Sequence, residues 1–140
     1  MAKTLTGGCA CGAVRYEISG EAKTSAQCQC RDCQRATGTG HVDSMTFPTS
    51  AVKLTGELKF HDSPSDSGNT MSRGFCPNCG SPVMWTLSRN PDVRVIMVGS
   101  LDDPSVFTPG VVFYTSSGHA WDQLDPALPK YETLPPPRPS

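Results

Sequence analysis

Small or apolar side chains alternate with polar ones in several short stretches of the chain, and turn-forming residues separate these stretches. Residues 13–18 (AVRYEI) show the alternation and are closed by Ser19 and Gly20, as is typical of a half-buried strand. Related patterns predict further strands over residues 42–47, 52–60, 71–75, 82–87, 93–98 and 111–114, with breaks at Pro48 and Gly56.

One segment favours a helical turn instead. Residues 28–36 (CQCRDCQRA) contain no β-branched side chain and are followed by Gly38 and Gly40, so a short helix that starts within the segment is expected. Residues 61–69 (HDSPSDSGN) are predicted to form a polar loop. The patterns together indicate a mainly β fold with short strands, many turns and little helix.

Composition and length agree with this picture. The chain has 140 residues, enough for one modest core, and its 13 Gly and 13 Pro interrupt it too often for long helices. Pro becomes frequent after residue 128, and residues 135–140 (PPPRPS) cannot build a core. We therefore expect one folded domain over residues 1–128 and a Pro-rich C-terminal tail over residues 129–140.

Charge and hydropathy restrict the partners. The formal net charge is −1, and thiolates on bound metal would make it more negative, so the chain lacks the basic field that a nucleic acid backbone requires. No segment approaches the ~18 consecutive apolar residues of a membrane span, and residues 1–8 lack the apolar run of a signal peptide. We expect a cytoplasmic protein that binds neither nucleic acid nor membrane.

Seven cysteines in three clusters carry the candidate chemistry. In a reducing cytosol, thiols persist unless they hold metal or react, and an odd number does not suit a disulfide framework. Cys76 and Cys79 form a CxxC followed by Gly80, and Cys9 and Cys11 form a CxC between glycines. The two pairs together predict one closed structural zinc site with four sulfur ligands.

The middle cluster, Cys28, Cys30 and Cys33, has three sulfurs and no cysteine left to complete it. A catalytic zinc site keeps one position for water or substrate, whereas a structural site is closed by four protein ligands. The cluster therefore predicts an open, catalytic zinc site. Two alternatives stay open: a histidine could close the site, or Cys28 and Cys33 could form a redox disulfide. The candidate histidines are His41, His61 and His119.

Three segments resemble the glutathione-dependent formaldehyde-activating enzyme family, which includes centromere protein V. They are GGCACGAVRYE at residues 7–17, CQCRDCQR at residues 28–35 and RGFCPNCGS at residues 73–81. The chain departs from the family at Gln29, where family members often have His. The resemblance implies a tent-like fold of short antiparallel sheets around the zinc sites. It also implies structural zinc on Cys9, Cys11, Cys76 and Cys79, and catalytic zinc on Cys28, Cys30 and Cys33.

The resemblance implies a carbon–sulfur lyase that adds a glutathione-like thiol to a small aldehyde such as formaldehyde, or runs the reverse reaction. An electron-rich three-thiolate zinc suits a sulfur substrate better than hydroxide chemistry. The competing interpretation is a non-catalytic zinc-stabilised binding module. Candidate cations for an anionic thiol, and aromatic side chains that could line a pocket, are Arg31, Arg35, Arg73, Trp85, Tyr114 and Trp121.

Overall fold

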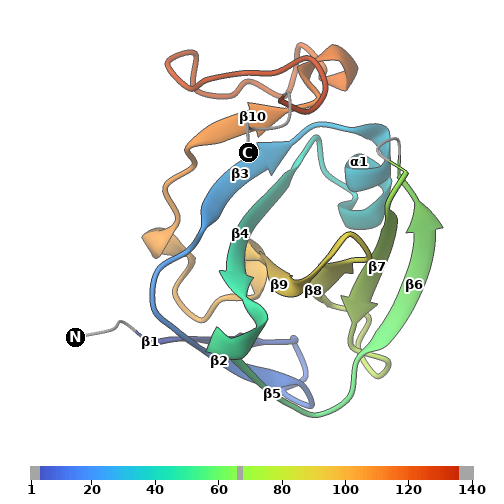
Figure 1. Ribbon diagram of the computed structural model, residues 1–140, viewed down its shortest axis with the longest axis vertical. Coiled ribbons are helices and arrows are strands. Elements are labelled where there is room, and N and C mark those ends of the chain that lie inside the picture. Colours follow the sequence, from blue (N-terminus) through green and yellow to red (C-terminus); the bar gives the residue numbers. More distant parts are fainter. Residues whose placement is uncertain (1–3, 66–67, 136–140) are drawn as a thin grey trace. The chain divides into compact units, whose positions relative to one another are not determined.

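The computed structural model describes residues 4–65 and 68–135 and is mainly β, with one α-helix in this part of the chain, α1 (Arg31–Thr37) (Figure 1). The expected mainly β fold with little helix is confirmed. The described residues divide into two compact units. The first contains residues 4–24, 44–65 and 68–107, and the second contains residues 25–43 and 108–135. No helix among the described residues is long and apolar enough to cross a membrane.

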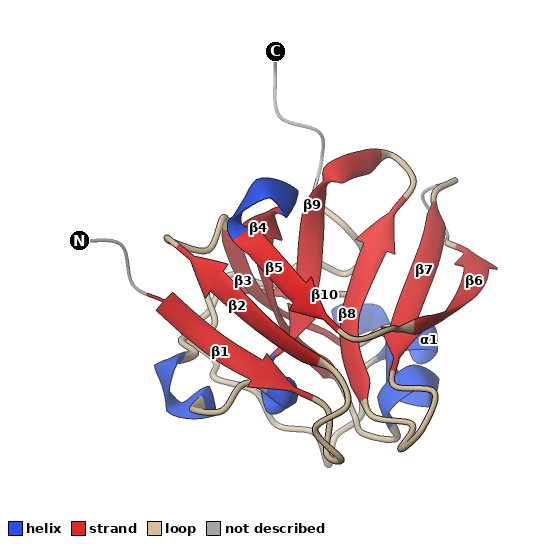
Figure 2. Ribbon diagram, turned by 90° about the horizontal axis from the view of Figure 1, so that it is seen from below, coloured by secondary structure: helices blue, strands red, loops and turns tan. Residues whose placement is uncertain are grey.

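The first unit contains a three-stranded antiparallel sheet. Its strands are β1 (Thr4–Gly8), β2 (Arg15–Ser19) and β5 (Val52–Thr55), in the order β1-β2-β5 (Figure 2). Strand β2 realises the alternation seen in the sequence, since Tyr16 and Ile18 are buried and the polar residues between them are exposed. This sheet therefore presents one apolar face to a core.

Further antiparallel strands complete the first unit, in the order β4-β9-β8-β7-β6. Their bounds are β4 (Val42–Pro48), of which residues 44–48 lie in this unit, β6 (Lys59–Pro64), β7 (Thr70–Phe75), β8 (Pro82–Leu87) and β9 (Asn90–Met97). The core joins side chains from both groups of strands, including Ile18, Phe47 and Ile96, and it also contains Cys9 and Cys76. Two cysteines of the predicted structural site thus lie in the core of this unit.

The second unit contains β3 (Thr24–Cys28), of which residues 25–28 lie in this unit, β10 (Val111–Phe113) and α1. Strands β3 and β10 pair in parallel, with Phe113 opposite Cys28. The backbone of Val112 also bonds to the segment that follows, since its N–H donates to the carbonyl of Pro129 and its carbonyl accepts from Tyr131. The division at residues 128 and 129 stays a prediction, and residues 136–140 of the proposed tail lie outside the described residues.

The described residues also form four short 3-10 helices. They are η1 (Thr49–Ala51), η2 (Val98–Ser100) and η3 (Pro104–Val106) in the first unit, and η4 (Thr115–Ser117) in the second.

Most predicted strands are observed, and the differences have physical reasons. Strands β1 (TLTGG) and β3 (TSAQC) were not predicted, because their small and polar residues show no clear alternation. The predicted loop over residues 61–69 is wrong for residues 61–64, which belong to β6. This strand is mostly exposed, so pairing with β7 rather than burial holds it, and its sequence shows no apolar period.

Candidate metal centres

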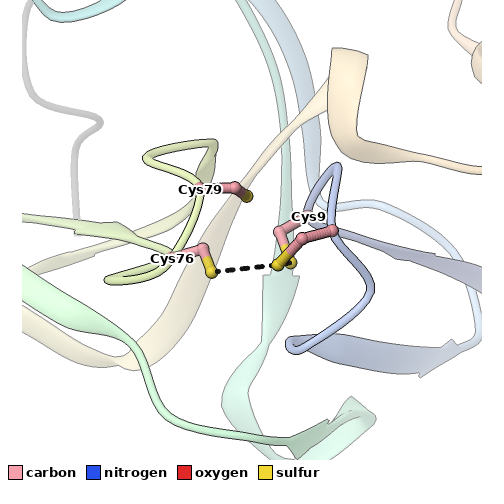
Figure 3. Close-up of side chains that lie close together, drawn as sticks. Cys9, Cys76 and Cys79 are labelled. Atoms are coloured by element: carbon pink, nitrogen blue, oxygen red, sulfur yellow. Dashed lines mark hydrogen bonds between the residues drawn. The ribbon is translucent and has the colours of Figure 1, made fainter.

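The first centre joins two loops of the first unit. Cys9 and Cys11 follow β1, and Cys76 and Cys79 lie between β7 and β8 (Figure 3). The four Sγ atoms lie within 4.8 Å of one another. Sulfur atoms are 3.6 Å apart for Cys9 and Cys11, and 3.8 Å apart for Cys11 and Cys76. Four sulfurs at ~2.3 Å from a tetrahedral zinc would be about 3.8 Å apart, so this donor set fits zinc.

Several N–H groups around the first centre point at the sulfurs. The backbone N–H of Val14 donates to Sγ of Cys9 at 3.2 Å, and Nδ2 of Asn78 donates to Sγ of Cys11 at 3.3 Å. The hydroxyl and backbone N–H of Ser81 lower the pKa of Cys79 to about 5. Hydrogen bonds of this kind stabilise thiolates and orient them as metal ligands.

The second centre lies in the second unit and contains Cys28, Cys30 and Cys33. Cys28 ends β3, Cys30 precedes α1 as its N-cap residue, and Cys33 lies in the first turn of the helix. Their Sγ atoms lie within 4.8 Å of one another. The strand end and the helix start therefore bring three sulfurs together within six residues.

The electrostatics of the second centre favour a cation. The thiol of Cys30 raises the pKa of Cys28 to about 12, and the thiols of Cys28 and Cys30 raise the pKa of Cys33 strongly. Three sulfurs this close cannot all carry negative charge without a counterion. A divalent ion would remove this penalty, and the three soft donors suit zinc. Both clusters could hold metal ions, and all seven cysteines are thiols.

Two of the histidines have other partners, and the third is exposed on a strand of the first unit. The ring nitrogens of His41 face Asp43 and Asp122, Nε2 of His119 lies 2.9 Å from Oε1 of Gln34, and His61 is exposed on β6. Among the described residues, the donor atoms that meet at the second centre within 4.8 Å of one another are the three sulfurs alone. The alternative in which a histidine closes this centre is therefore not supported by the geometry.

A hydrogen-bonded network lies next to the second centre and centres on His41. Its Nδ1 is 2.9 Å from both carboxylate oxygens of Asp122, and its Nε2 is 3.1 Å from Oδ1 of Asp43. The amide of Gln27 donates to Asp43 at 2.9 Å, and that of Gln29 donates to Asp122 at 3.1 Å. The pKa of His41 rises to about 9, chiefly because of the hydrogen bond to Asp43.

A second buried amide, that of Gln34, organises the other side of the centre. Its Nε2 donates to the carbonyl oxygens of Gln29 at 2.7 Å and Ser117 at 3.0 Å. Its Oε1 accepts from the guanidinium of Arg31 and meets Nε2 of His119. The ring of His119 stacks on Trp121, with 5.0 Å between the centroids, and Trp121 is 71% exposed. Arg31 and Trp121 are thereby connected to the loop that carries the cysteines.

The other candidate side chains have mixed positions. Arg35 is exposed on α1, whereas Arg73 lies in the first unit, 4.7 Å above the ring of Trp85, and donates to Ser63. Trp85 is buried in the first unit. Tyr114 adopts a left-handed backbone conformation at the start of η4. The core location of Trp85 matches the commoner role of a buried aromatic residue.

Sequence patterns did not identify the network residues Gln27, Asp43 and Asp122, nor the roles of Gln29 and Gln34. One signal was available, since His41 and Asp43 flank the buried Val42 on β4 and so share one face. Asp122 had no such signal, because it lies 81 positions after His41.

Two comparisons with known proteins concern the fold and the family. A crystal structure of a Rhodobacter sphaeroides protein is 24% identical, and the match covers 69% of this chain and 87% of that chain with a TM-score of 0.55. This likeness concerns the fold. A model of the family described as glutathione-dependent formaldehyde-activating enzyme matches residues 4–117. Because that match spans most of the 140 residues, the chain belongs to the glutathione-dependent formaldehyde-activating enzyme family.

Proposed function

We propose that the protein is a zinc-dependent enzyme of the carbon–sulfur lyase type. It joins a small thiol such as glutathione to a small aldehyde such as formaldehyde, or runs the reverse reaction. The observation that carries the proposal is that the Cys28, Cys30 and Cys33 sulfurs lie together and that no imidazole or carboxylate of the described residues completes the group. Family membership supports the substrate class.

The two clusters have different proposed roles. Cys9, Cys11, Cys76 and Cys79 would hold a structural zinc, because four sulfurs close a tetrahedral site. Cys28, Cys30 and Cys33 would hold the catalytic zinc, because three sulfurs leave room for a substrate ligand. The proposed location is the cytoplasm, where reducing conditions keep thiols available for metal.

Cys28, Cys30 and Cys33 would hold the zinc, which would supply Lewis-acid chemistry suited to the thiolate form of a small thiol substrate. Three thiolates supply more negative charge than neutral imidazoles, which favours a sulfur substrate over hydroxide. In the forward direction one carbon–sulfur bond forms, the carbonyl becomes a hydroxyl, and the thiol proton ends on its oxygen. The reaction needs no oxidant or reductant, so thiol and aldehyde are sufficient.

Exchange NMR with ¹³C-formaldehyde and glutathione tests the proposal, because it measures interconversion of free and thiol-bound carbon at equilibrium. We expect the zinc-loaded protein to raise the exchange rate above the uncatalysed rate in proportion to its concentration. Cys33→Ser should return the rate to the uncatalysed value. A zinc assay serves as the control, since this variant should keep one zinc per chain in the four-sulfur centre.

Equal exchange rates with and without the zinc-loaded wild-type protein would overturn the enzymatic proposal for these substrates. The non-catalytic zinc-stabilised binding module would then be the better interpretation. A second arm replaces zinc with cobalt and adds glutathione at millimolar concentration. Binding at the second centre should change the absorption bands of one cobalt ion only.

A further inference from the structure

Cys28 lies between two glutamines, and both connect to the same histidine. On one side, the amide of Gln27 donates to Asp43, which lies 3.1 Å from Nε2 of His41. On the other side, the amide of Gln29 donates to Asp122, which lies 2.9 Å from Nδ1 of His41. Two hydrogen-bonded paths therefore run from the peptide units around Cys28 to one imidazole ring.

The two carboxylates of this network hold the His41 ring in one orientation. Both ring nitrogens of His41 face a carboxylate, and only a doubly protonated imidazole can donate to both. The resulting cation lies between two anions, and such charge-assisted hydrogen bonds are stronger than neutral ones. Asp43 and Asp122 are in turn oriented by the glutamine amides, so each carboxylate has a donor on both sides.

The surrounding backbone leaves room for this network. A Cβ atom on Gly40 would lie 2.5 Å from Cγ of Asp122, and one on Gly118 would lie 2.6 Å from Oε1 of Gln29. Contacts this short between non-bonded heavy atoms would force the Asp122 or Gln29 side chain to shift, so each glycine allows the close approach that is observed. Gln29 itself is 6% exposed, and its carbonyl accepts from Gln34.

We propose that His41 is a positioning residue for Cys28, which it holds through Gln27 and Gln29 in the orientation that the three-sulfur centre needs. Cys28 is the last residue of β3, and the N–H of Gln29 continues the pairing with β10 by donating to the carbonyl of Phe113 at 3.0 Å. Side chains of successive residues along a strand point to opposite faces, so holding Gln27 and Gln29 sets the direction of the Cys28 side chain between them. Cys30 and Cys33 are oriented by α1, and Cys28 lies outside the helix. His41 thus supplies the orientation that the helix cannot. The inference rests on the proposed metal-binding role of the second centre.

Cobalt affinity of the two centres tests this role. Each protein is loaded with two cobalt ions, and a chelator then competes for the metal. The proteins compared are wild type, His41→Gln and a control, His61→Gln. The control changes an exposed histidine of the first unit. Loss of outer contacts to metal ligands weakens binding about 10-fold or more. We expect His41→Gln to lower the cobalt affinity of the three-sulfur centre by about 10-fold and to shift the ligand-field bands of the cobalt bound there. The four-sulfur centre, and both centres in His61→Gln, should not change.

If His41→Gln folds poorly, milder variants can test the positioning role instead. Gln27→Met and Asp43→Asn change the same hydrogen-bonded path, so each should lower the cobalt affinity of the three-sulfur centre. The double variant should bind cobalt at this centre no more weakly than the weaker of the two single variants. Unchanged affinity and bands in His41→Gln, or full additivity along the path, would overturn the positioning role.

The failure of the proposed function has a different signature. Glutathione would then leave the cobalt spectrum of wild type unchanged, while His41→Gln would still weaken the second metal. Uptake of a single cobalt ion by wild type would overturn both the proposed function and the positioning role.

Discussion

The backbone N–H of Cys33 donates to Sγ of Cys30 at 3.3 Å, so one cysteine both caps α1 and contributes to the three-sulfur centre. Cys30 has extended backbone angles, φ −64° and ψ 154°, as an N-cap residue does. Its carbonyl also accepts the first intrahelical hydrogen bond, from Gln34. The start of the helix and the geometry of the centre therefore coincide at one residue.

Two substitutions separate these roles of Cys30. Cys30→Ser keeps a side-chain acceptor for the N–H of Cys33, whereas Cys30→Ala removes it. We expect both variants to lose the second metal, because both lose a sulfur ligand. Without metal, Cys30→Ala should be less stable than Cys30→Ser by about 1 kcal/mol, the usual value of an N-cap. Zinc content and urea unfolding measure the two effects, and equal stability would show that the cap contributes nothing.

Gly118 offers a steric test of the packing against Gln29. Its φ of −72° is accessible to any residue, so Gly118→Ala acts through its new methyl group, which would lie 2.6 Å from Oε1 of Gln29. We expect a loss of about 1–3 kcal/mol in unfolding free energy. Gly99→Ala is the matched control, since a Cβ there has no heavy atom within 4 Å. Chemical denaturation should show a small change for the control, and equal losses would contradict the packing.

His41 predicts a pH dependence of stability. Its pKa is about 9 in the folded protein, above the ~6.5 of an unfolded chain. The contribution of His41 to the free energy of unfolding is therefore fully present below about pH 6.5 and is lost as the pH rises through about 9. Below about pH 6.5, we expect the free energy of unfolding of wild type to exceed that of His41→Gln by about 1–2 kcal/mol, after allowance for solvent screening. Urea unfolding across this range should show the difference shrinking, and a difference that is constant with pH would contradict the assignment.

The two centres should differ in their effect on folding. Cys79→Ser removes a ligand from the centre that ties the β1–β2 loop to the β7–β8 loop, whereas Cys33→Ser affects a cluster within six residues of chain. A structural zinc contributes on the order of 10 kcal/mol of apparent folding free energy. Thermal melts should therefore show a much larger loss for Cys79→Ser, and also for Cys9→Ser, than for Cys33→Ser. Similar losses in all three variants would contradict the division into a structural and a catalytic centre.

Gln34 connects Trp121 to the second centre, and fluorescence can test this. Gln34→Ala leaves the carbonyls of Gln29 and Ser117 without its amide, which costs about 1–3 kcal/mol for a buried group. The loss of the contact to His119 should also change the emission of the stacked Trp121, measured in a Trp85→Phe background. Gln123→Ala, at an exposed position, is the control and should change neither property.

The sequence by itself determined which cysteines come together. Spacings such as CxxC and CxCxxC confine sulfurs within a few residues, and a turn of that length has few geometries. A short helix starting within residues 28–36 was likewise predicted and is observed as α1, and the alternation in β2 was visible, because hydrophobic period and helix preference act over a few neighbouring residues.

Only the tertiary structure decided the surroundings of the second centre. The pairing of His41 with Asp122 joins residues 81 positions apart, and no local sequence pattern predicts it. Burial of Gln29 and Gln34 was also not visible, because a polar side chain becomes internal only where distant segments supply its hydrogen bonds. The parallel pairing of β3 with β10 has the same origin, since strand partners distant in sequence are chosen by packing and not by local preference.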